Sequence, residues 1–386
     1  MWATILSGLC FCGWASALVI LTWGTRRVLR AADLEPADTN ETPRVSVIVA
    51  ARDEAAAISP AIESLLALDW PDLEVVAVDD RSGDGTGQLL DELARRDPRL
   101  RVLHVTELPG GWLGKTHALW VGSRQATGQW LLFTDADVHF HPGALRRAVS
   151  HASRAGLDQL TLIPDLISGS LFNEILYNAF GMAMWIGAYL DQIESADSEA
   201  FMGIGAFNLV RRSTWRKTGG FEAIRMEIAD DMGVGMLINQ AGGRCRAAVG
   251  PDAVQLEWYP SARATIRGLR KNAFAVMCGF SFWRAAAISA AIILTVLGPL
   301  MAFATDVGWV QLLAGLALAM PVSNAAAISR RWHRRFWPAV FAPVGQLMIV
   351  WAIIGSALHY WRNAGVDWRG THYRLEELRR NQKVHI

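Results

Sequence analysis

Residues 130–137 decide the fold of this chain and read Trp-Leu-Leu-Phe-Thr-Asp-Ala-Asp. Four large apolar residues in succession are typical of a strand inside a parallel sheet. Side chains alternate along a strand, so Asp135 and Asp137 project in the same direction at its carboxyl end. Two such carboxylates repel each other unless a cation lies between them, and Mg²⁺ or Mn²⁺ fits this oxygen pair. The alternative is a polar loop whose aspartates cap the next helix.

The chain before this stretch predicts alternating strands and helices. Strands rich in β-branched residues are expected at residues 45–51, 73–78 and 101–105, and each is followed by a turn or loop and a helical pattern. This alternation predicts an α/β fold with a parallel sheet and right-handed crossovers. Polar residues follow the strand ends, at the edge where open α/β sheets bind ligands: Asp53, Asp80, Asp135 and Asp137.

Two common nucleotide-binding motifs are excluded. The first strand continues into Ala-Arg-Asp-Glu rather than Gly-x-Gly-x-x-Gly, which argues against a dinucleotide fold. Residues 110–116 resemble a Walker motif, but their glycine spacing is wrong and they follow a long loop instead of a strand.

The two ends of the chain are strongly apolar. Residues 1–25 contain no charge and are followed at once by arginines, which predicts an uncleaved anchor, then a linker at 26–43, with the next segment in the cytoplasm. Residues 285–361 contain three charge-free stretches of spanning length, and a basic tail follows at 362–386. Three crossings there would place the basic tail outside, so either the positive-inside rule fails or one segment, with the last most suspect, is re-entrant.

Charge and cysteine content exclude other classes. A net charge of +1 argues against nucleic acid as a partner. The four cysteines, at positions 10, 12, 245 and 278, suggest neither a disulfide framework nor a zinc site.

Four segments together resemble glycosyltransferase family 2. They are Val-Ser-Val-Ile-Val-Ala-Ala-Arg-Asp-Glu at 45–54, Val-Asp-Asp-Arg-Ser-Gly-Asp-Gly-Thr at 78–86, Gly-Trp-Leu-Gly-Lys at 111–115 and Thr-Asp-Ala-Asp at 134–137. The chain is most similar to the membrane-bound branch that includes ceramide glucosyltransferase and the hopene-associated and carotenoid glycosyltransferases. This resemblance implies a GT-A catalytic domain at residues 44–260, flanked by transmembrane helices, that binds a nucleotide-diphosphate sugar.

The resemblance also implies roles for the donor-side residues. Asp80, with Asp79 beside it, would hold the base, and Arg52 and Asp53 would line the same pocket. Lys115 would approach the donor as a point charge suited to phosphate. Asp137 would ligate the Mg²⁺ or Mn²⁺ ion, and Asp135 would lie beside it and contact the sugar or ribose.

On the acceptor side, the family carries an acidic pair that matches Asp230 and Asp231. Asp231 is expected to be the base that takes the proton of the acceptor hydroxyl, with Asp230 in support. The alternative is that one of the two caps the helix that follows. The apolar stretch 166–190 fits a core helix, a lipid-facing helix or an acceptor-binding element, and a helix at the membrane surface is favoured.

A basic helix is predicted at residues 261–284. Its arginines at 263, 267 and 270 can share one face. Related enzymes carry Gln/Arg-x-x-Arg-Trp here, whereas this chain has Lys271 in place of Trp. The resemblance therefore implies diphosphate binding by Arg267 and Arg270 but no polymer threading. The alternative is an interfacial helix that meets anionic lipid, and both can hold.

The tail at residues 367–373 resembles a Trp-Lys/Arg-Gly-x-x-Tyr sequence of related enzymes. This likeness suggests that the tail folds back to the catalytic side.

These expectations combine into one function. The chain is predicted to be a multi-pass cell-membrane enzyme with a cytoplasmic catalytic domain, a metal-dependent, inverting glycosyltransferase that moves one sugar from a UDP-sugar to a lipid hydroxyl. The alternatives are a processive polysaccharide synthase, disfavoured by the altered basic motif, and a non-catalytic membrane protein that binds a nucleotide-sugar. The latter has no use for a base such as Asp231.

Overall fold

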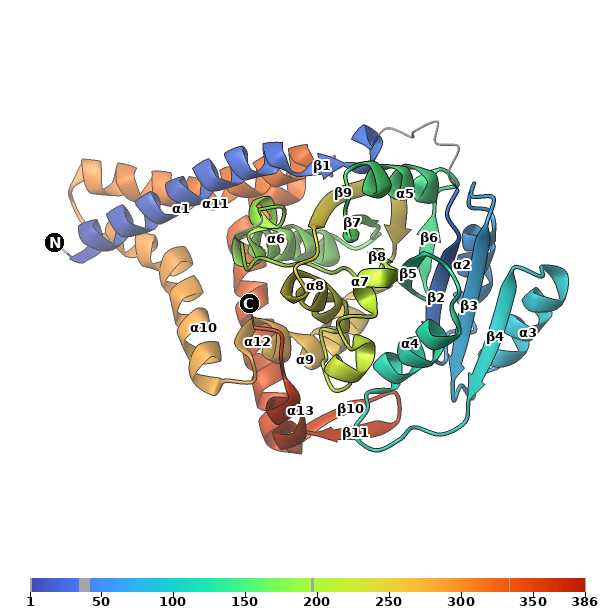
Figure 1. The fold of residues 1–386 in the computed structure, drawn as a ribbon. Coiled ribbons are helices and arrows are strands. Elements are labelled where there is room, and N and C mark those ends of the chain that lie inside the picture. The colour runs from blue at the N-terminus through green and yellow to red at the C-terminus, as the bar shows by residue number, and fades with distance from the viewer. Residues whose placement is uncertain (1, 35–41, 196–197, 333, 386) are drawn as a thin grey trace.

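A computed structural model describes residues 2–34, 42–195, 198–332 and 334–385. Figure 1 shows an α/β body from which an arm of long helices projects. The strands of the body are β1 (Leu29–Arg30), β2 (Val45–Ala51), β3 (Leu73–Asp80), β4 (Leu100–Val105), β5 (Trp130–Asp135), β6 (Val138–Phe140), β7 (Gln159–Leu166), β8 (Asn208–Arg211) and β9 (Cys245–Leu256).

These strands form one mixed sheet in the order β1-β9-β7-β8-β5-β2-β3-β4, and β6 pairs with β9. The expected parallel arrangement is confirmed for β2, β3, β4 and β5. The direction of β8, which was not predicted, is antiparallel to both β5 and β7. The reason lies at the carboxyl end of β5, where the Asp135 N–H donates to the Gly205 carbonyl (3.0 Å). The chain returns to the sheet at that end, so β8, which begins three residues later, can only run backwards along β5.

The helices of the body cover both faces of the sheet. They are α2 (Ile58–Leu66), α3 (Thr86–Arg96), α4 (Gly114–Gln125), α5 (Ala144–Arg154), α6 (Leu171–Ala188), α7 (Arg212–Trp215) and α8 (Asp230–Gln240). Alternation along β2 sends Val47 and Val49 into the cluster that contains α2, and Ile48 into the opposite cluster with Leu119 of α4. The central strands are buried on both sides, as their continuous apolar sequences require.

The helix α6 is an internal wall. Most of its residues are buried, and it packs against α11 (Gly308–Arg331) and α12 (Ala342–Asn363). Its polar residues have partners inside the protein, including Glu174, which pairs with Arg334 (3.4 Å), and Asn178, which bonds to Ser329 (2.5 Å). The helix exposed at the membrane surface that was favoured for this stretch is therefore not what the structure shows.

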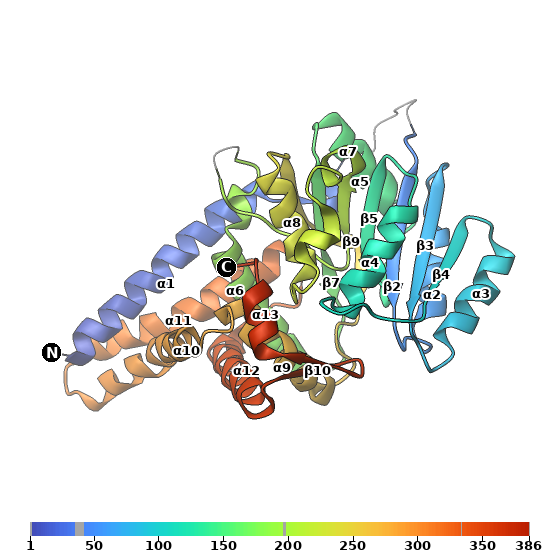
Figure 2. The ribbon, with the colours of Figure 1, turned by 60° about the horizontal axis from the view of Figure 1, so that its bottom comes forward.

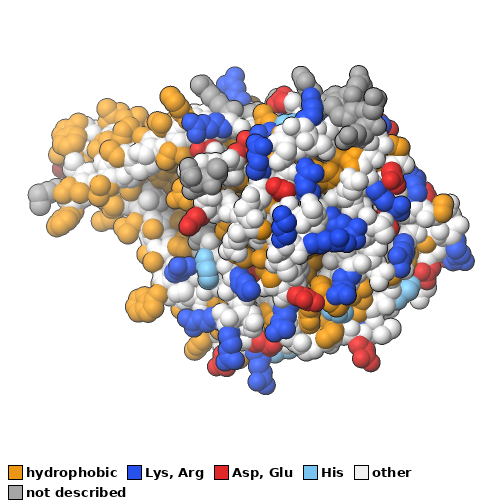
Figure 3. Space-filling view, in the orientation of Figure 1, with side chains coloured by type: hydrophobic (Ala, Val, Ile, Leu, Met, Phe, Trp, Pro, Cys, Tyr) orange, Lys and Arg blue, Asp and Glu red, His pale blue; other side chains and the backbone are white. Residues whose placement is uncertain are grey.

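Four apolar helices in the described part of the chain are long enough to cross a membrane. Their spanning stretches are Thr4–Gly24 in α1 (Trp2–Arg27), Phe282–Ala304 in α10 (Phe282–Leu297) and η4 (Gly298–Ala304), Gly308–Arg330 in α11, and Trp337–Asn363 in η5 (Trp337–Phe341) and α12. In Figures 1 and 2, α1, α10 and α11 project together from the body. Figure 3 shows that hydrophobic side chains cover this arm, whereas charged ones cover the body.

The remaining elements lie between the arm and the sheet. The basic helix α9 (Ala262–Cys278) packs against α12. The tail forms a hairpin of β10 (Gly365–Trp368) and β11 (Thr371–Arg374), followed by α13 (Leu375–Asn381). Here the tail folds back onto the body, as its sequence suggested, because the Tyr373 hydroxyl accepts a hydrogen bond from the Gly114 N–H at the start of α4 (3.2 Å).

Candidate active site

One lysine joins the carboxylates from two parts of the chain. Lys115, in the first turn of α4, places its Nζ 2.7 Å from Asp135 Oδ1 and 3.2 Å from Asp230 Oδ2. Asp135 ends β5, and Asp230 and Asp231 begin α8. The expectation that one of the acidic pair caps this helix is wrong, because Ala229 holds the N-cap position without a side-chain bond. The fold therefore brings the acidic pair to the strand end that carries Asp135.

The loop before β8 fixes this arrangement with two glycines. The Gly205 carbonyl accepts from the Asp135 N–H, and the Gly205 N–H donates to Asp231 Oδ2 (2.9 Å). A Cβ at Gly205 would lie 2.6 Å from Asp135 Oδ2, and a Cβ at Gly203 would lie 1.7 Å from the Asp231 carbonyl oxygen. Only glycine fits at position 203, where the neighbour is backbone, whereas a side chain at position 205 would have to displace the Asp135 carboxylate.

The electrostatics of this cluster follow from burial and from like charges. Burial raises the pKa of Asp230 to about 7, and Asp231 and Asp135 act in the same direction while Lys115 opposes them. Burial raises the pKa of Asp231 as well, again opposed by Lys115. Burial alone would lower the pKa of Lys115, but the three carboxylates raise it. The Lys115 ammonium group therefore interacts with three carboxylates, and it remains protonated.

The Asp-x-Asp pair points to a further cation. Burial, followed by repulsion from Asp135 and Glu54, raises the pKa of Asp137 to about 7. Within the described ranges, no group of three or more His, Cys, Asp or Glu side chains is placed to hold a metal. Mg²⁺ is commonly held by one or two carboxylates together with substrate phosphates. Asp135 and Asp137 fit that pattern, in which the donor diphosphate completes the ligand set.

The residues expected around the nucleotide base gather at the ends of β2 and β3. The buried Asp80 carboxylate forms a two-point contact with Arg81 (2.7 and 2.9 Å), and Arg52 Nη1 lies 3.7 Å away. Asp53, at φ 53°, accepts from the Gly83 N–H (2.8 Å) and ties the two loops together.

Asp79 faces the other way. Its Oδ2 lies 3.1 Å from His104 Nδ1, and its Oδ1 accepts from the Ser82 N–H (3.3 Å). Its side chain therefore organises β4 and the loop after β3.

Sequence reasoning missed the part that the tail hairpin plays beside the site. Arg369, at the tip of the hairpin, forms an ion pair with Glu54. Trp368 lies over Lys271 of α9, whose Nζ is 3.4 Å from the ring centroid. The sequence contained one signal for the hairpin, the glycine at position 370, because two-residue hairpin turns favour glycine. In the structure Arg369 and Gly370 form such a turn, with positive φ angles of 49° and 78°. What the sequence lacked was the position of the hairpin against Glu54.

The basic motif of α9 divides between surface and interior. Arg267 is exposed on α9, and the side chain of Arg270 lies outside the described part of the structure. Burial lowers the pKa of Lys271 to about 7. Thus Lys271, which replaces the family's Trp, is the member of this motif that contacts the hairpin.

An apolar cavity of about 440 Å³ opens from the carboxylates. Asp135 and Asp231 lie at its polar end. Its walls come from α6, the loop before β8, α9 and the long helices, and include Ile288 of α10 and Ile349 and Ala352 of α12. The cavity therefore connects the candidate catalytic residues with helices that are apolar enough to enter a membrane.

Comparison with known proteins agrees with this geometry. Residues 46–219 match the model of glycosyl transferase family 2. Over 125 residues the chain is 36% identical to the succinoglycan biosynthesis protein ExoO of Rhizobium meliloti. This match covers 32% of this chain and 34% of that protein. Over 117 residues it is 37% identical to the beta-monoglucosyldiacylglycerol synthase of Synechocystis, covering 30% and 24%. The matched part is thus about a third or less of each relative's length.

A solved structure shares the fold over nearly the whole chain. The mannosyltransferase PcManGT from Pyrobaculum calidifontis, solved in complex with GDP-Man and Mn²⁺, superposes with a TM-score of 0.55 at 21% identity and covers 93% of this chain and 99% of that one. This likeness supports the GT-A arrangement expected from the motifs. The family assignment itself is limited to residues 46–219, which match the model of glycosyl transferase family 2.

Proposed function

We propose that this protein is a membrane-anchored, inverting glycosyltransferase that moves one sugar from a UDP-sugar to a lipid hydroxyl at the cytoplasmic face of the cell membrane. The observation that carries the proposal is the cavity that joins Asp135 and Asp231 to α10 and α12. An apolar passage from the reacting groups toward membrane-directed helices suits an acceptor with a polar head and a hydrocarbon chain. The name of the Synechocystis relative, a monoglucosyldiacylglycerol synthase, agrees with a lipid acceptor.

The acceptor hydroxyl is activated by Asp231. Its carboxylate faces the cavity and is held by the N–H groups of Gly205 and Met232 (2.9 and 2.8 Å). Asp231 takes the proton of the hydroxyl as its oxygen attacks the anomeric carbon, and the bond from that carbon to the diphosphate breaks. A single displacement inverts the anomeric centre and needs no enzyme nucleophile.

The donor diphosphate is bound by positive charge from this chain. Lys115 lies between the donor-side Asp135 and the acid pair, and Arg369 adds charge from the tail hairpin. Lys271 of α9, whose pKa burial lowers to about 7, is only partly protonated at neutral pH and adds less. A Mg²⁺ or Mn²⁺ ion at Asp135 and Asp137 would supply further charge to stabilise the leaving diphosphate. The Mn²⁺ in the PcManGT complex supports a metal of this kind. Arg52, Asp53 and Asp80 line the base and ribose end.

The test is transfer by the full chain purified into lipid nanodiscs, with UDP- and GDP-sugars, extracted lipid acceptors and Mn²⁺ or Mg²⁺. We expect a discrete glycolipid from the wild type, donor binding without turnover by Asp231→Asn, and loss of metal-dependent donor binding by Asp137→Ala. Asp72→Asn, a half-exposed carboxylate at the start of β3, is the matched control and should transfer normally.

Three results would contradict the proposal. Normal transfer by Asp231→Asn would assign the base elsewhere. A long polymer instead of a discrete glycolipid would favour a processive synthase. Donor binding without transfer to any lipid would favour a non-catalytic binding protein.

A further inference from the structure

The docked tail limits how many times the chain can cross a membrane. The buried Glu227 side chain of the body accepts hydrogen bonds from the N–H groups of Lys383 and Val384 in the tail (2.8 and 3.0 Å), and Tyr373 is bonded to Gly114. Body and tail therefore lie on the same side of the membrane. Three of the four candidate spans lie between them in the sequence. An odd number of crossings would separate what the structure holds together, so one of the three does not cross.

The helix α12 differs from the other candidates in direction and burial. In Figure 1, α1 and α11 lie side by side in the arm and α10 slopes obliquely from the body to the outer end of the arm, whereas α12 runs across the direction of α1 and α11 and along the body. Half of its apolar stretch (50%) is buried inside the protein, against 17%, 28% and 39% for the stretches in α1, α10 and α11. Ile349 and Ala352, near its middle, line the same cavity as Asp231. The middle of α12 is thus level with the active site rather than with the arm.

The helix α12 packs against α10 of the arm and also against α9, which is unsuited to hydrocarbon. The helix α9 packs along it, with the Tyr360 hydroxyl donating to the Lys271 carbonyl (2.9 Å) and the Phe274 N–H donating to Ser356 Oγ (3.0 Å). The same α9 exposes Arg263 and Arg267. A crossing by α12 would carry α9 and these charges toward the bilayer centre, where charged side chains are costly.

The outer face of α12 is nevertheless apolar from Val344 to Trp361, before the exposed Arg362 and Asn363 at its carboxyl end. It consists of five exposed residues at helical spacing: Val344, Trp351, Ile354, Leu358 and Trp361. Two polar side chains within this stretch, Ser356 and Tyr360, turn inward. An apolar strip with tryptophans on one side of a helix, continuous with the apolar arm, is the pattern of a helix that lies in a membrane surface.

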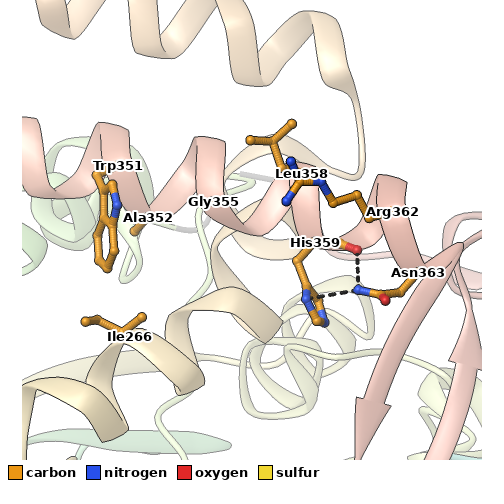
Figure 4. Close-up of a pocket in the computed structure, with 8 residues that line it drawn as sticks. All are labelled: Ile266, Trp351, Ala352, Gly355, Leu358, His359, Arg362 and Asn363. Carbon is orange, nitrogen blue, oxygen red and sulfur yellow. Dashed lines mark hydrogen bonds between the residues drawn. The ribbon is translucent and has the colours of Figure 1, made fainter.

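The groove between α9 and α12 agrees with this position. Figure 4 shows Ile266 of α9 and Trp351 of α12 facing each other at its apolar part. His359, Arg362 and Asn363 lie at its other end, where Asn363 Nδ2 is bonded to His359. Apolar residues beside a basic end suit the boundary between acyl chains and anionic headgroups.

We propose that α12 lies in the membrane surface on the side of the active site, with its outer face in the lipid, and that the chain crosses the membrane only with α1, α10 and α11. This inference rests on the membrane anchoring in the proposed function but not on glycosyl transfer. It resolves the conflict between three C-terminal spans and a basic tail, because two crossings return the tail to the cytoplasmic side. It also places the mouth of the cavity at the level of lipid headgroups.

The first test asks which side each segment occupies. Single cysteines replace Arg95 in α3, Asp306 in the loop before α11, and Arg380 in α13, each exposed, in a Cys12→Ala background because the other native cysteines are buried. A membrane-impermeant maleimide is applied to sealed vesicles of known orientation. We expect Arg95→Cys and Arg380→Cys to be labelled from one side and Asp306→Cys from the other. Labelling of positions 95 and 380 from opposite sides would overturn the inference.

The second test measures depth. Spin labels at Val344→Cys, Ile354→Cys and Trp361→Cys report their depth through the ratio of collisions with oxygen and with a polar nickel complex. A spanning α12 would separate positions 344 and 361 by about 26 Å along the membrane normal, since a helix rises about 1.5 Å per residue. We expect instead one shallow depth for all three, while Leu316→Cys, in the middle of α11, reads deep. A deep Ile354→Cys between two shallow ends, or three positions without lipid contact, would overturn the inference.

These tests fail independently of the proposed function. A protein that shows this topology but transfers no sugar refutes the enzyme proposal alone. A protein that transfers sugar while position 354 lies at the bilayer centre refutes the placement of α12 alone.

Discussion

The close approach of Gly205 to the Asp135 carboxylate gives a quantitative prediction for Gly205→Ala. The added Cβ would lie 2.6 Å from Asp135 Oδ2, whereas ordinary contact begins at 3.4 Å. The carboxylate must therefore move by about 0.8 Å from the position in which it pairs with Lys115. A misplacement of about 1 Å costs about 10²-fold in rate. We expect kcat/KM to fall by about that factor, or about 2.7 kcal/mol of transition-state stabilisation.

The assay compares kcat/KM for the donor with a control from another loop. Gly83→Ala places its Cβ in open space at an ordinary φ and should keep wild-type activity. The melting temperature is measured as well, in the wild type and in an Asp135→Ala background. If the clash acts through that carboxylate, Gly205→Ala lowers the melting temperature only where Asp135 is present. Equal activity of Gly205→Ala and the wild type, or an equal loss in Gly83→Ala, would refute the reasoning.

Three further predictions concern the tail and β4. Glu227→Ala removes the carboxylate that accepts hydrogen bonds from two tail amides, and each bond to a charged group is worth about 1.5–3 kcal/mol. Hydrogen exchange at residues 383–384 should therefore accelerate. The control Glu376→Ala, at an exposed position of the tail, should leave this exchange rate unchanged. Arg369→Ala removes the partner of Glu54 and should raise the donor KM more than it lowers kcat; an unchanged KM would separate the hairpin from donor binding. Hydrogen bonds to Asp79 and Asp91 raise the pKa of His104. The stability that protonated His104 adds to the folded state is therefore fully present below pH 6.5 and is lost as pH rises through the raised pKa. We expect His104→Gln to lower the melting temperature at pH 6 but not at pH 9.

The sequence alone determined the elements whose signals are local. The continuous apolar run of β2 and the motif at the end of β5 predicted the parallel core, because strands buried on both faces must be apolar throughout. The length of the charge-free stretches predicted the four candidate spans, because the thickness of the bilayer sets a minimum length for a helix that crosses it. The motifs predicted a glycosyltransferase family 2 domain, and residues 46–219 match the model of that family.

Only the tertiary structure decided the features that depend on contacts between distant segments. The direction of β8 depends on where the chain returns to the sheet, and the meeting of Lys115 with Asp230 joins residues far apart in sequence. The positions of Arg369 and α12 depend on a tail that docks across the body. Local pattern fixes which face of an element is apolar. Which partner covers that face is set by packing of the whole chain, and no single window of sequence contains that information.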